Sequence, residues 1–196
     1  SRKLRFSASR TIQIAQKLYE GSNIGSETTG LITYMRTDGV QLGAEAIGTI
    51  RDDIGSRFGA RYVPDKPRVY KTKAANAQEA HEAIRPTAIE RDPKVMQAYL
   101  DHDQFRLYEL IWKRTIASQM QSAELDQAGV DITNHAGDAV LRANGQVMVF
   151  DGFLSVYRES VDDSSDAENG DDSDSGKLLP ELTEGESLAT DAVTPE

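Results

Sequence analysis

The spacing of apolar residues changes at about residue 122, and this change constrains the fold more than any other feature of the 196-residue sequence. Before it, apolar residues recur every three or four positions, which is the period of an amphipathic helix. After it, short apolar runs alternate with turn-forming residues, which is typical of β-strands. We therefore predict a mixed α+β protein, with an α-rich domain at 1–122 and a β-rich segment at 123–196.

Helical periodicity is found in four stretches of the first domain. They cover residues 7 or 9 to 19, 44–58, 77–84 and 103–122. Ser9 is a plausible N-cap for the first stretch, Gly59 ends the second and Pro86 ends the third. In the fourth, an apolar stripe runs from Phe105 to Met120, and it is better explained as protein core than as a surface on which nucleic-acid bases stack.

Short β-strand patterns dominate the second segment. They are predicted at 130–132, 140–143, 147–150, 153–157 and 188–193. Asn144-Gly145 is the dipeptide preferred in two-residue hairpin turns, so we predict a turn there. Residues 161–176 are acidic and serine-rich, and they contain too little apolar surface to offset the entropy of ordering, so a disordered insert is expected.

The net charge of −10 is divided unevenly between the two halves. Residues 1–123 hold 19 Lys and Arg against 14 Asp and Glu, whereas residues 124–196 hold 3 against 18. The first half could therefore meet a polyanion, and most of the second half would repel one. An alternative is that the asymmetry is chance surface composition around one acidic insert.

Composition limits the class of protein further. No stretch approaches the 18 apolar residues of a membrane span, so a membrane anchor is not expected. The absence of cysteine excludes disulfides and thiolate metal sites, and it is compatible with the cytoplasm. The chain starts at Ser1 without a methionine and stops at Glu196 without a closing signal, so we expect it to be a fragment of a longer protein.

The segment from Gly30 to Asp38 is the strongest candidate for chemistry. Its apolar run, 31–34, predicts a brief strand that ends in a polar loop. The run ends at Tyr34, and Arg36 follows two residues later. A phenol with a pKa near 10 acts as a nucleophile only where positive charge stabilises the developing anion. The alternative interpretation is a half-buried aromatic beside a surface ion pair between Arg36 and Asp38.

A second candidate motif covers residues 76–87. If this stretch is helical, His81 shares a face with Gln78 and Arg85. An imidazole beside a guanidinium would suit a phosphodiester, whose charge must be stabilised during displacement. A structural histidine on an amphipathic helix is the alternative. The three histidines of the chain are too scattered to predict a zinc site.

These two motifs, in this order, resemble those of type IA DNA topoisomerases, and among them the bacterial topoisomerase I branch. The first is Gly-Leu-Ile-Thr-Tyr-Met-Arg-Thr-Asp and the second is Gln-Glu-Ala-His-Glu-Ala-Ile-Arg-Pro-Thr. Segments 7–20 and 110–120 resemble the family's flanking helices, so the similarity covers residues 4 to 156 and resumes after the acidic insert. The sequence departs from the family pattern at Gly39, where many relatives have serine, and in that insert.

The resemblance implies a role for each matching residue. Tyr34 would be the nucleophile that becomes linked to a 5′ phosphate of single-stranded DNA, Arg36 would stabilise that phosphate and the phenolate, and His81 would approach the scissile phosphate. Support at the DNA would come from Arg85, Thr33, Gln78 and Asp38. The reaction would relax negatively supercoiled DNA without ATP, which makes the whole enzyme an isomerase.

The resemblance also implies an architecture. Residues 1–122 would be a winged-helix-like (CAP-like) cleavage domain with a truncated start, and residues 123–196 would be part of a β-rich hinge domain that opens a gate. No cofactor is expected in this chain, because Mg²⁺ would be held by a Toprim domain that is absent from it. The fragment would be a monomer that cannot relax DNA alone, and its partners would be DNA and the rest of a cytoplasmic, nucleoid-associated polypeptide.

Two other functions stay open from the sequence. A non-catalytic DNA-binding module would grip phosphates through the basic half and would not depend on Tyr34. An interaction module would recruit a basic partner through the acidic half.

Overall fold

The computed structural model of the protein describes residues 3–25, 27–70, 82–156 and 182–189. The described residues fall into two compact units. The first, which we call the helical unit, holds residues 3–122 together with 152–156. The second contains residues 123–151 and 182–189, and its regular structure is a two-stranded ribbon.

Helix α1 spans Ala8–Glu20 and begins two residues earlier than a cap at Ser9 would allow. The N-cap is Ser7, whose hydroxyl accepts a hydrogen bond from the backbone N–H of Arg10. Ser9 therefore lies inside the helix, and the prediction that it caps the helix is wrong. At the other end Gly21 is the C-cap, with a φ of 139°.

Helices α2 and α4 follow the predicted pattern closely, whereas η1 and α3 were not predicted. Helix α2 spans Ala44–Phe58 and stops at Gly59, as the periodicity predicts, and the short η1 helix, Ala60–Tyr62, follows it. Helix α3 spans Pro93–Met96 and α4 spans His102–Gln119. A reciprocal pair of hydrogen bonds between Asp101 and Gln104 starts α4, which satisfies backbone groups that the first turn leaves unpaired.

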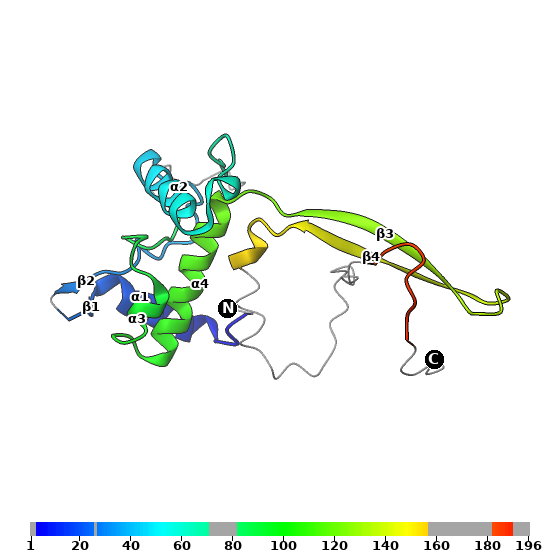
Figure 1. Ribbon diagram of the computed structural model, residues 1–196. Helices are drawn as coiled ribbons and strands as arrows, with labels where there is room; N and C mark the ends of the chain where they lie inside the picture. The colour runs from blue at the N-terminus through cyan, green and yellow to red at the C-terminus, as the bar shows by residue number, and fades with distance from the viewer. Residues whose placement is uncertain (1–2, 26, 71–81, 157–181, 190–196) are drawn as a thin grey trace. The chain divides into compact units, whose positions relative to one another are not determined.

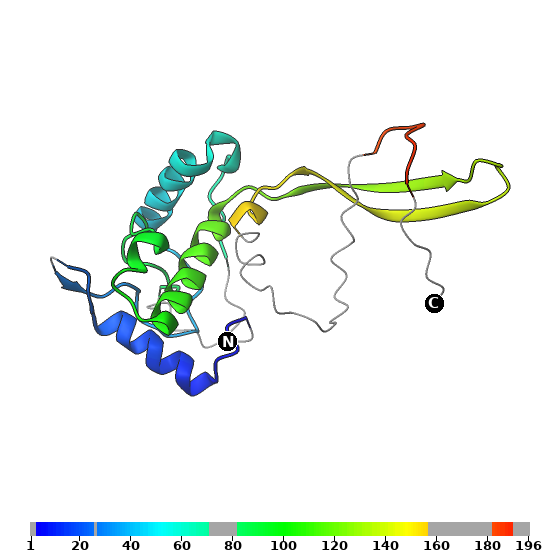
Figure 2. The same cartoon turned by 60° about the horizontal axis from the view of Figure 1, so that its bottom comes forward.

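Helix α4 is the centre of the helical unit and packs against both α1 and α2 (Figures 1 and 2). Its predicted stripe is core: Tyr108 and Ile116 are completely buried, and Trp112 and Met120 nearly so. A helical turn at 154–156 adds Val156 to the same core, so the strand predicted at 153–157 is wrong for its described residues. Burying one apolar side chain of this size contributes about 1.5–3 kcal/mol.

A small antiparallel hairpin joins α1 to the tyrosine segment. Strand β1 is Ser22–Asn23 and β2 is Thr28–Thr29. The side-chain oxygen of Asn23 accepts a hydrogen bond of 3.0 Å from the backbone N–H of Gly25, which has a φ of 95°. This region carries only a polar, glycine-rich pattern in the sequence, and that pattern does not reveal the hairpin.

The second unit contains one long ribbon, drawn in green and yellow in Figure 1. Strand β3, Glu124–Thr133, pairs antiparallel with β4, Val140–Phe150. The strands predicted at 130–132, 140–143 and 147–150 are parts of these two. Residues 188 and 189, which begin the last predicted strand, are not in a strand, and its remaining residues and the insert 161–176 lie outside the described residues.

The predicted turn at Asn144-Gly145 is wrong. Those residues lie inside β4, paired with Gly129 and Ala128. The chain turns at 134–139 instead, where the side-chain oxygen of Asn134 accepts hydrogen bonds from the N–H groups of residues 138 and 139. Gly137 supplies the left-handed conformation, with a φ of 73°. A turn held by its own side-chain hydrogen bonds outweighs a dipeptide preference.

Candidate functional site

The two motifs singled out in the sequence lie side by side in the helical unit. Ile32 and Pro86 form an antiparallel bridge. It is flanked by a 2.9 Å hydrogen bond from Thr33 N to Arg85 O and a 3.0 Å hydrogen bond from Thr87 N to Leu31 O. The strand predicted at 31–34 is reduced to this one bridge, because proline has no N–H with which to extend a ladder. The bridge nevertheless fixes the start of one motif against the end of the other.

The Thr33 side chain strengthens this connection immediately before Tyr34. Its hydroxyl donates to the carbonyl of Ala83 at 2.9 Å and accepts from the backbone N–H of Arg85 at 3.0 Å. At the other end of the pairing, the hydroxyl of Thr87 donates to Gly30 O at 2.7 Å. Two threonine hydroxyls thus satisfy backbone groups that the short pairing leaves unbonded.

The helix predicted at 77–84 is wrong for the residues that the structure describes. Residues 82–84 are not helical, and Ala83 N donates to Gln41 O at 2.8 Å across the chain. Gln78 and His81 lie outside the described residues, so a helical face shared with Arg85 stays a prediction for them. Arg85 itself is in no helix, and both its N–H and its carbonyl bond to Thr33.

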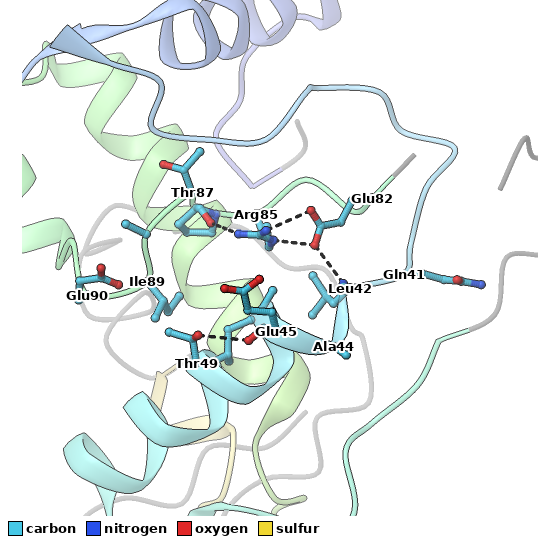
Figure 3. A pocket seen from close by; sticks show the side chains of 15 residues that line it. Gln41, Leu42, Ala44, Glu45, Thr49, Glu82, Arg85, Thr87, Ile89 and Glu90 are labelled. Carbon is cyan, nitrogen blue, oxygen red and sulfur yellow. Dashed lines mark hydrogen bonds and ion pairs between the residues drawn. The ribbon is translucent and has the colours of Figure 1, made fainter. Parts of the chain in front are cut away.

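Glu82 joins this segment to the beginning of α2. One carboxylate oxygen accepts from Nε of Arg85 at 2.8 Å and from the backbone N–H of Gly43 at 3.0 Å, and the other accepts from Nη2 of Arg85 at 3.1 Å (Figure 3). Burial acts to raise the pKa of the Glu82 carboxyl, but the hydrogen bonds from Arg85 and Gly43 outweigh it and hold the pKa below its usual range. Glu82 is therefore a charged anchor.

A groove of about 810 Å³ lies between the first turns of α2 and the 82–90 segment. Figure 3 shows Arg85 paired with Glu82 of the same segment, with Glu45 on the facing helix. The lining also includes Glu90, so three carboxylates stand against one guanidinium, and that guanidinium is already paired. The charged side chains that line the groove therefore carry a net negative charge.

Tyr34 follows directly on the paired segment, and 51% of its surface is exposed. Its ring meets the ring of Tyr19 edge to face, with centroids 5.3 Å apart and planes inclined by 66°. About half of the Tyr34 surface is covered, so the structure leaves open both the half-buried aromatic of the alternative interpretation and the nucleophile. A phenol exposed in this way is accessible to a large substrate.

Arg36 and Asp38 form the ion pair that the alternative interpretation named. Arg36 Nε lies 2.8 Å from one carboxylate oxygen of Asp38. The other oxygen of Asp38 is buried and finds no hydrogen-bond partner within the described part of the chain. An exposed ion pair contributes little to stability, but it restricts the orientations available to the guanidinium two residues after Tyr34.

Sequence reasoning missed two residues of this site. Glu82 was identifiable in principle as an acidic residue three positions before Arg85, although the contact is not made on a helix. Tyr19 had no signal at all, because nothing in the helical pattern of α1 shows that its ring meets Tyr34.

No group of three or more His, Cys, Asp or Glu side chains in residues 3–25, 27–70, 82–156 and 182–189 is placed to hold a metal ion. No helix there is long and apolar enough to cross a membrane.

The sequence of the chain matches a known family. The family model for DNA topoisomerase matches residues 1–196, and the chain belongs to that family. DNA topoisomerase 1 of Rickettsia conorii is 53% identical over 195 residues, which is 100% of this chain and 24% of that protein. DNA topoisomerase 1 of Xylella fastidiosa strain Temecula1 is 48% identical over 197 residues, again 100% of this chain and 24% of the relative.

A solved structure shares the fold as well as the sequence. Full-length topoisomerase I from Thermotoga maritima matches 80% of this chain with a TM-score of 0.63 and 36% identity, and the match covers 24% of that protein. The mixed helix-and-sheet architecture predicted from the sequence is confirmed. The chain spans about a quarter of the length of the relatives it matches.

Proposed function

We propose that this chain is the DNA-cleavage region of a bacterial topoisomerase I and that Tyr34 is its nucleophile. The proposal is carried by one observation. Tyr34 is exposed, and it lies at the end of a segment that is hydrogen-bonded to the second motif. A nucleophile on such a rigid support loses little entropy when it meets its substrate.

The proposed step exchanges one phosphodiester for another. The Tyr34 oxygen gives up its proton and attacks phosphorus, forming a bond to the 5′ phosphate. The bond from phosphorus to the 3′ oxygen breaks, and that oxygen leaves as a hydroxyl. Because the new ester replaces the old one, the 3′ hydroxyl reverses the step without ATP. The Arg36 guanidinium stabilises the negative charge on phosphate and phenolate.

The remaining site residues support this step. His81 contacts the scissile phosphate, and its neighbour Glu82 is held by Arg85 and by the first turn of α2. Thr33 is part of the support under Tyr34. Gln78, Arg85 and Asp38 contribute to DNA binding around the phosphate, with Asp38 acting through Arg36.

Other parts of the proposal concern the full-length protein. The helical unit is its winged-helix-like cleavage domain, and the ribbon is part of a hinge domain that lets a DNA gate open. Mg²⁺ is bound by carboxylates of a Toprim domain elsewhere in the polypeptide and supplies charge neutralisation at the phosphates. The full-length protein relaxes negatively supercoiled DNA in the cytoplasm, associated with the nucleoid, whereas the fragment alone is an inactive monomer.

The test is a covalent-adduct assay on a full-length protein that carries this chain. A 3′-labelled single-stranded oligonucleotide is incubated with wild type, with Tyr34→Phe and with Tyr99→Phe, and the products are separated on a denaturing gel. Tyr99 is a matched control because 46% of its surface is exposed in the same unit. We expect a labelled protein band for wild type and Tyr99→Phe and none for Tyr34→Phe.

DNA binding by the Tyr34→Phe protein should stay within about 1 kcal/mol of wild type, because only one hydroxyl is lost. A labelled band from the Tyr34→Phe protein would refute the assignment of the nucleophile. Binding without a band in any of the three proteins would instead support a non-catalytic DNA-binding module.

A further inference from the structure

The ring of Tyr19, in the last turn of α1, lies against the ring of Tyr34, although neither the family resemblance nor the sequence pattern draws attention to it. We propose that Tyr19 is a positioning residue that holds the Tyr34 phenol in its reactive orientation. The inference rests on the proposed function, because it concerns the same nucleophile.

The contact has the geometry of a favourable aromatic pair. A centroid separation of 5.3 Å and an interplanar angle of 66° place the edge of one ring towards the face of the other. Such an arrangement brings the positive ring edge to the negative ring face and is favoured over a face-to-face sandwich. It therefore favours a subset of the side-chain orientations open to Tyr34.

The support behind Tyr19 is rigid. Leu18, its neighbour in α1, is completely buried, and the carbonyl of Leu18 accepts a 2.7 Å hydrogen bond from the backbone N–H of Leu31. A Cβ atom at Gly30 would lie 2.5 Å from the carbonyl oxygen of Tyr19, so this close approach of the two backbones requires glycine. The end of α1 and the start of the tyrosine segment are thus held together by backbone contacts at Leu18 and Tyr19.

Burial does not account for the ring pair. Tyr19 is 41% exposed and Tyr34 is 51% exposed, whereas α1 contributes Ile14, Ala15 and Leu18 to the core. A partly exposed pair beside the core gains little from the hydrophobic effect. Its clearest consequence is orientation, because a phenol that attacks phosphorus in line must have its oxygen correctly directed.

The experiment compares Tyr19→Leu with Tyr19→Phe in a full-length protein that carries this chain, with Ile12→Ala as the control. Ile12 lies on the same helix and is 58% exposed. Single-turnover rates of cleavage and of religation are measured at saturating single-stranded oligonucleotide, together with the oligonucleotide Kd and the Tm.

We expect Tyr19→Leu to slow cleavage and religation alike by about threefold to tenfold, which corresponds to the usual strength of an aromatic pair. The two rates fall together because both directions use the same orientation of Tyr34. Tyr19→Phe keeps the ring and should restore both rates to within twofold of wild type. In the Ile12→Ala protein, the oligonucleotide Kd, the Tm and both rates should stay at their wild-type values.

Two results would overturn the inference. Wild-type rates in the Tyr19→Leu protein would show that the ring does not orient Tyr34, and equal losses in Tyr19→Phe and Tyr19→Leu would assign the effect to the hydroxyl. Failure of the proposed function looks different, because wild type itself would then form no adduct through Tyr34.

Discussion

The helical unit and the β3–β4 ribbon are stabilised in different ways. In the helical unit, buried side chains from α1, α2 and α4 form one continuous core. In the ribbon, two strands are held by the hydrogen bonds of their ladder, and apolar side chains such as Val140 and Leu141 are exposed. A two-stranded sheet has no interior, so its stability depends on local pairing and on whatever covers its faces.

This difference indicates which part of the molecule can hold a reactive side chain in a defined position. Thr33, Glu82 and Arg85 are held by hydrogen bonds between segments about 40 or 50 residues apart in sequence, against a packed core. Contacts in the ribbon join residues that are close in sequence, and most of its side chains are at least partly exposed. A reactive side chain needs the first kind of support, because its position must be held from several directions.

The largest expected effect comes from breaking the core. Ile116→Ala should lower the free energy of unfolding of the 196-residue chain by about 2–5 kcal/mol, because it leaves a cavity at a completely buried position of α4. Leu141→Ala, at a position in β4 that is 67% exposed, should change it by about 0.5 kcal/mol or less.

Urea denaturation is the measurement, followed by far-UV circular dichroism and by the fluorescence of Trp112, the single tryptophan. Because Trp112 lies in α4, its fluorescence reports the helical unit selectively. Equal losses for the two substitutions would contradict the contrast between a packed unit and an open ribbon.

A smaller effect should come from the polar link at the site. Thr33→Val removes a hydroxyl that bonds to both Ala83 O and Arg85 N, so two backbone groups lose their partner and stability should fall by about 1–3 kcal/mol. The comparison in the ribbon is Asp131→Asn, which breaks an exposed pair with Arg142 that spans 3.7 Å. That substitution should lower the free energy of unfolding by about 0.5 kcal/mol or less.

Both variants conserve side-chain shape. Urea titration at pH 7 therefore compares how much the Thr33 hydrogen bonds and the Asp131–Arg142 pair contribute to the free energy of unfolding. A Thr33→Val protein as stable as wild type would show that the pairing of the two motifs does not need the threonine hydroxyl.

The smallest effect tests the ribbon itself. Gly137→Ala should destabilise the hairpin by about 1 kcal/mol, because position 137 has a φ of 73°, which a residue with a Cβ adopts at a cost. Gly145→Ala, inside β4, should instead stabilise it by about 0.5 kcal/mol, since alanine loses less entropy than glycine on entering a strand.

Amide hydrogen exchange at the paired residues Ile132 and Leu141 measures both changes. If the substitution at position 145 destabilised the hairpin more than the one at position 137, the turn would lie at Asn144-Gly145 and not at 134–139.

Elements with a strong local pattern were predicted well. Helix α2 has the predicted bounds, because its apolar residues recur at helical spacing and Gly59 ends it. Both long strands contain the predicted short ones. The errors lie where local preference competes with other bonds: Asn144-Gly145 is a good turn dipeptide, but Asn134 closes the turn earlier with its own side chain.

The candidate site was predicted only in part, for the same reason. Tyr34, Arg36 and Asp38 are close in sequence, so the exposed phenol and the ion pair beside it follow from one short motif. The non-helical position of Arg85 did not follow from its neighbours, because it depends on hydrogen bonds to Thr33, 52 residues away.

Local sequence is sufficient to predict helices α1, α2 and α4, the division near residue 122, the motifs and, through them, the family, because each is encoded in neighbouring residues. Three contacts are seen only in the folded chain. They are the hydrogen bonds of Thr33 with Arg85 and of Glu82 with Gly43, and the ring contact of Tyr19 with Tyr34. These contacts form when α1, α2 and the 82–87 segment pack beside one another. Long-range contacts depend on the packing of the whole unit, and no local pattern of residues specifies them.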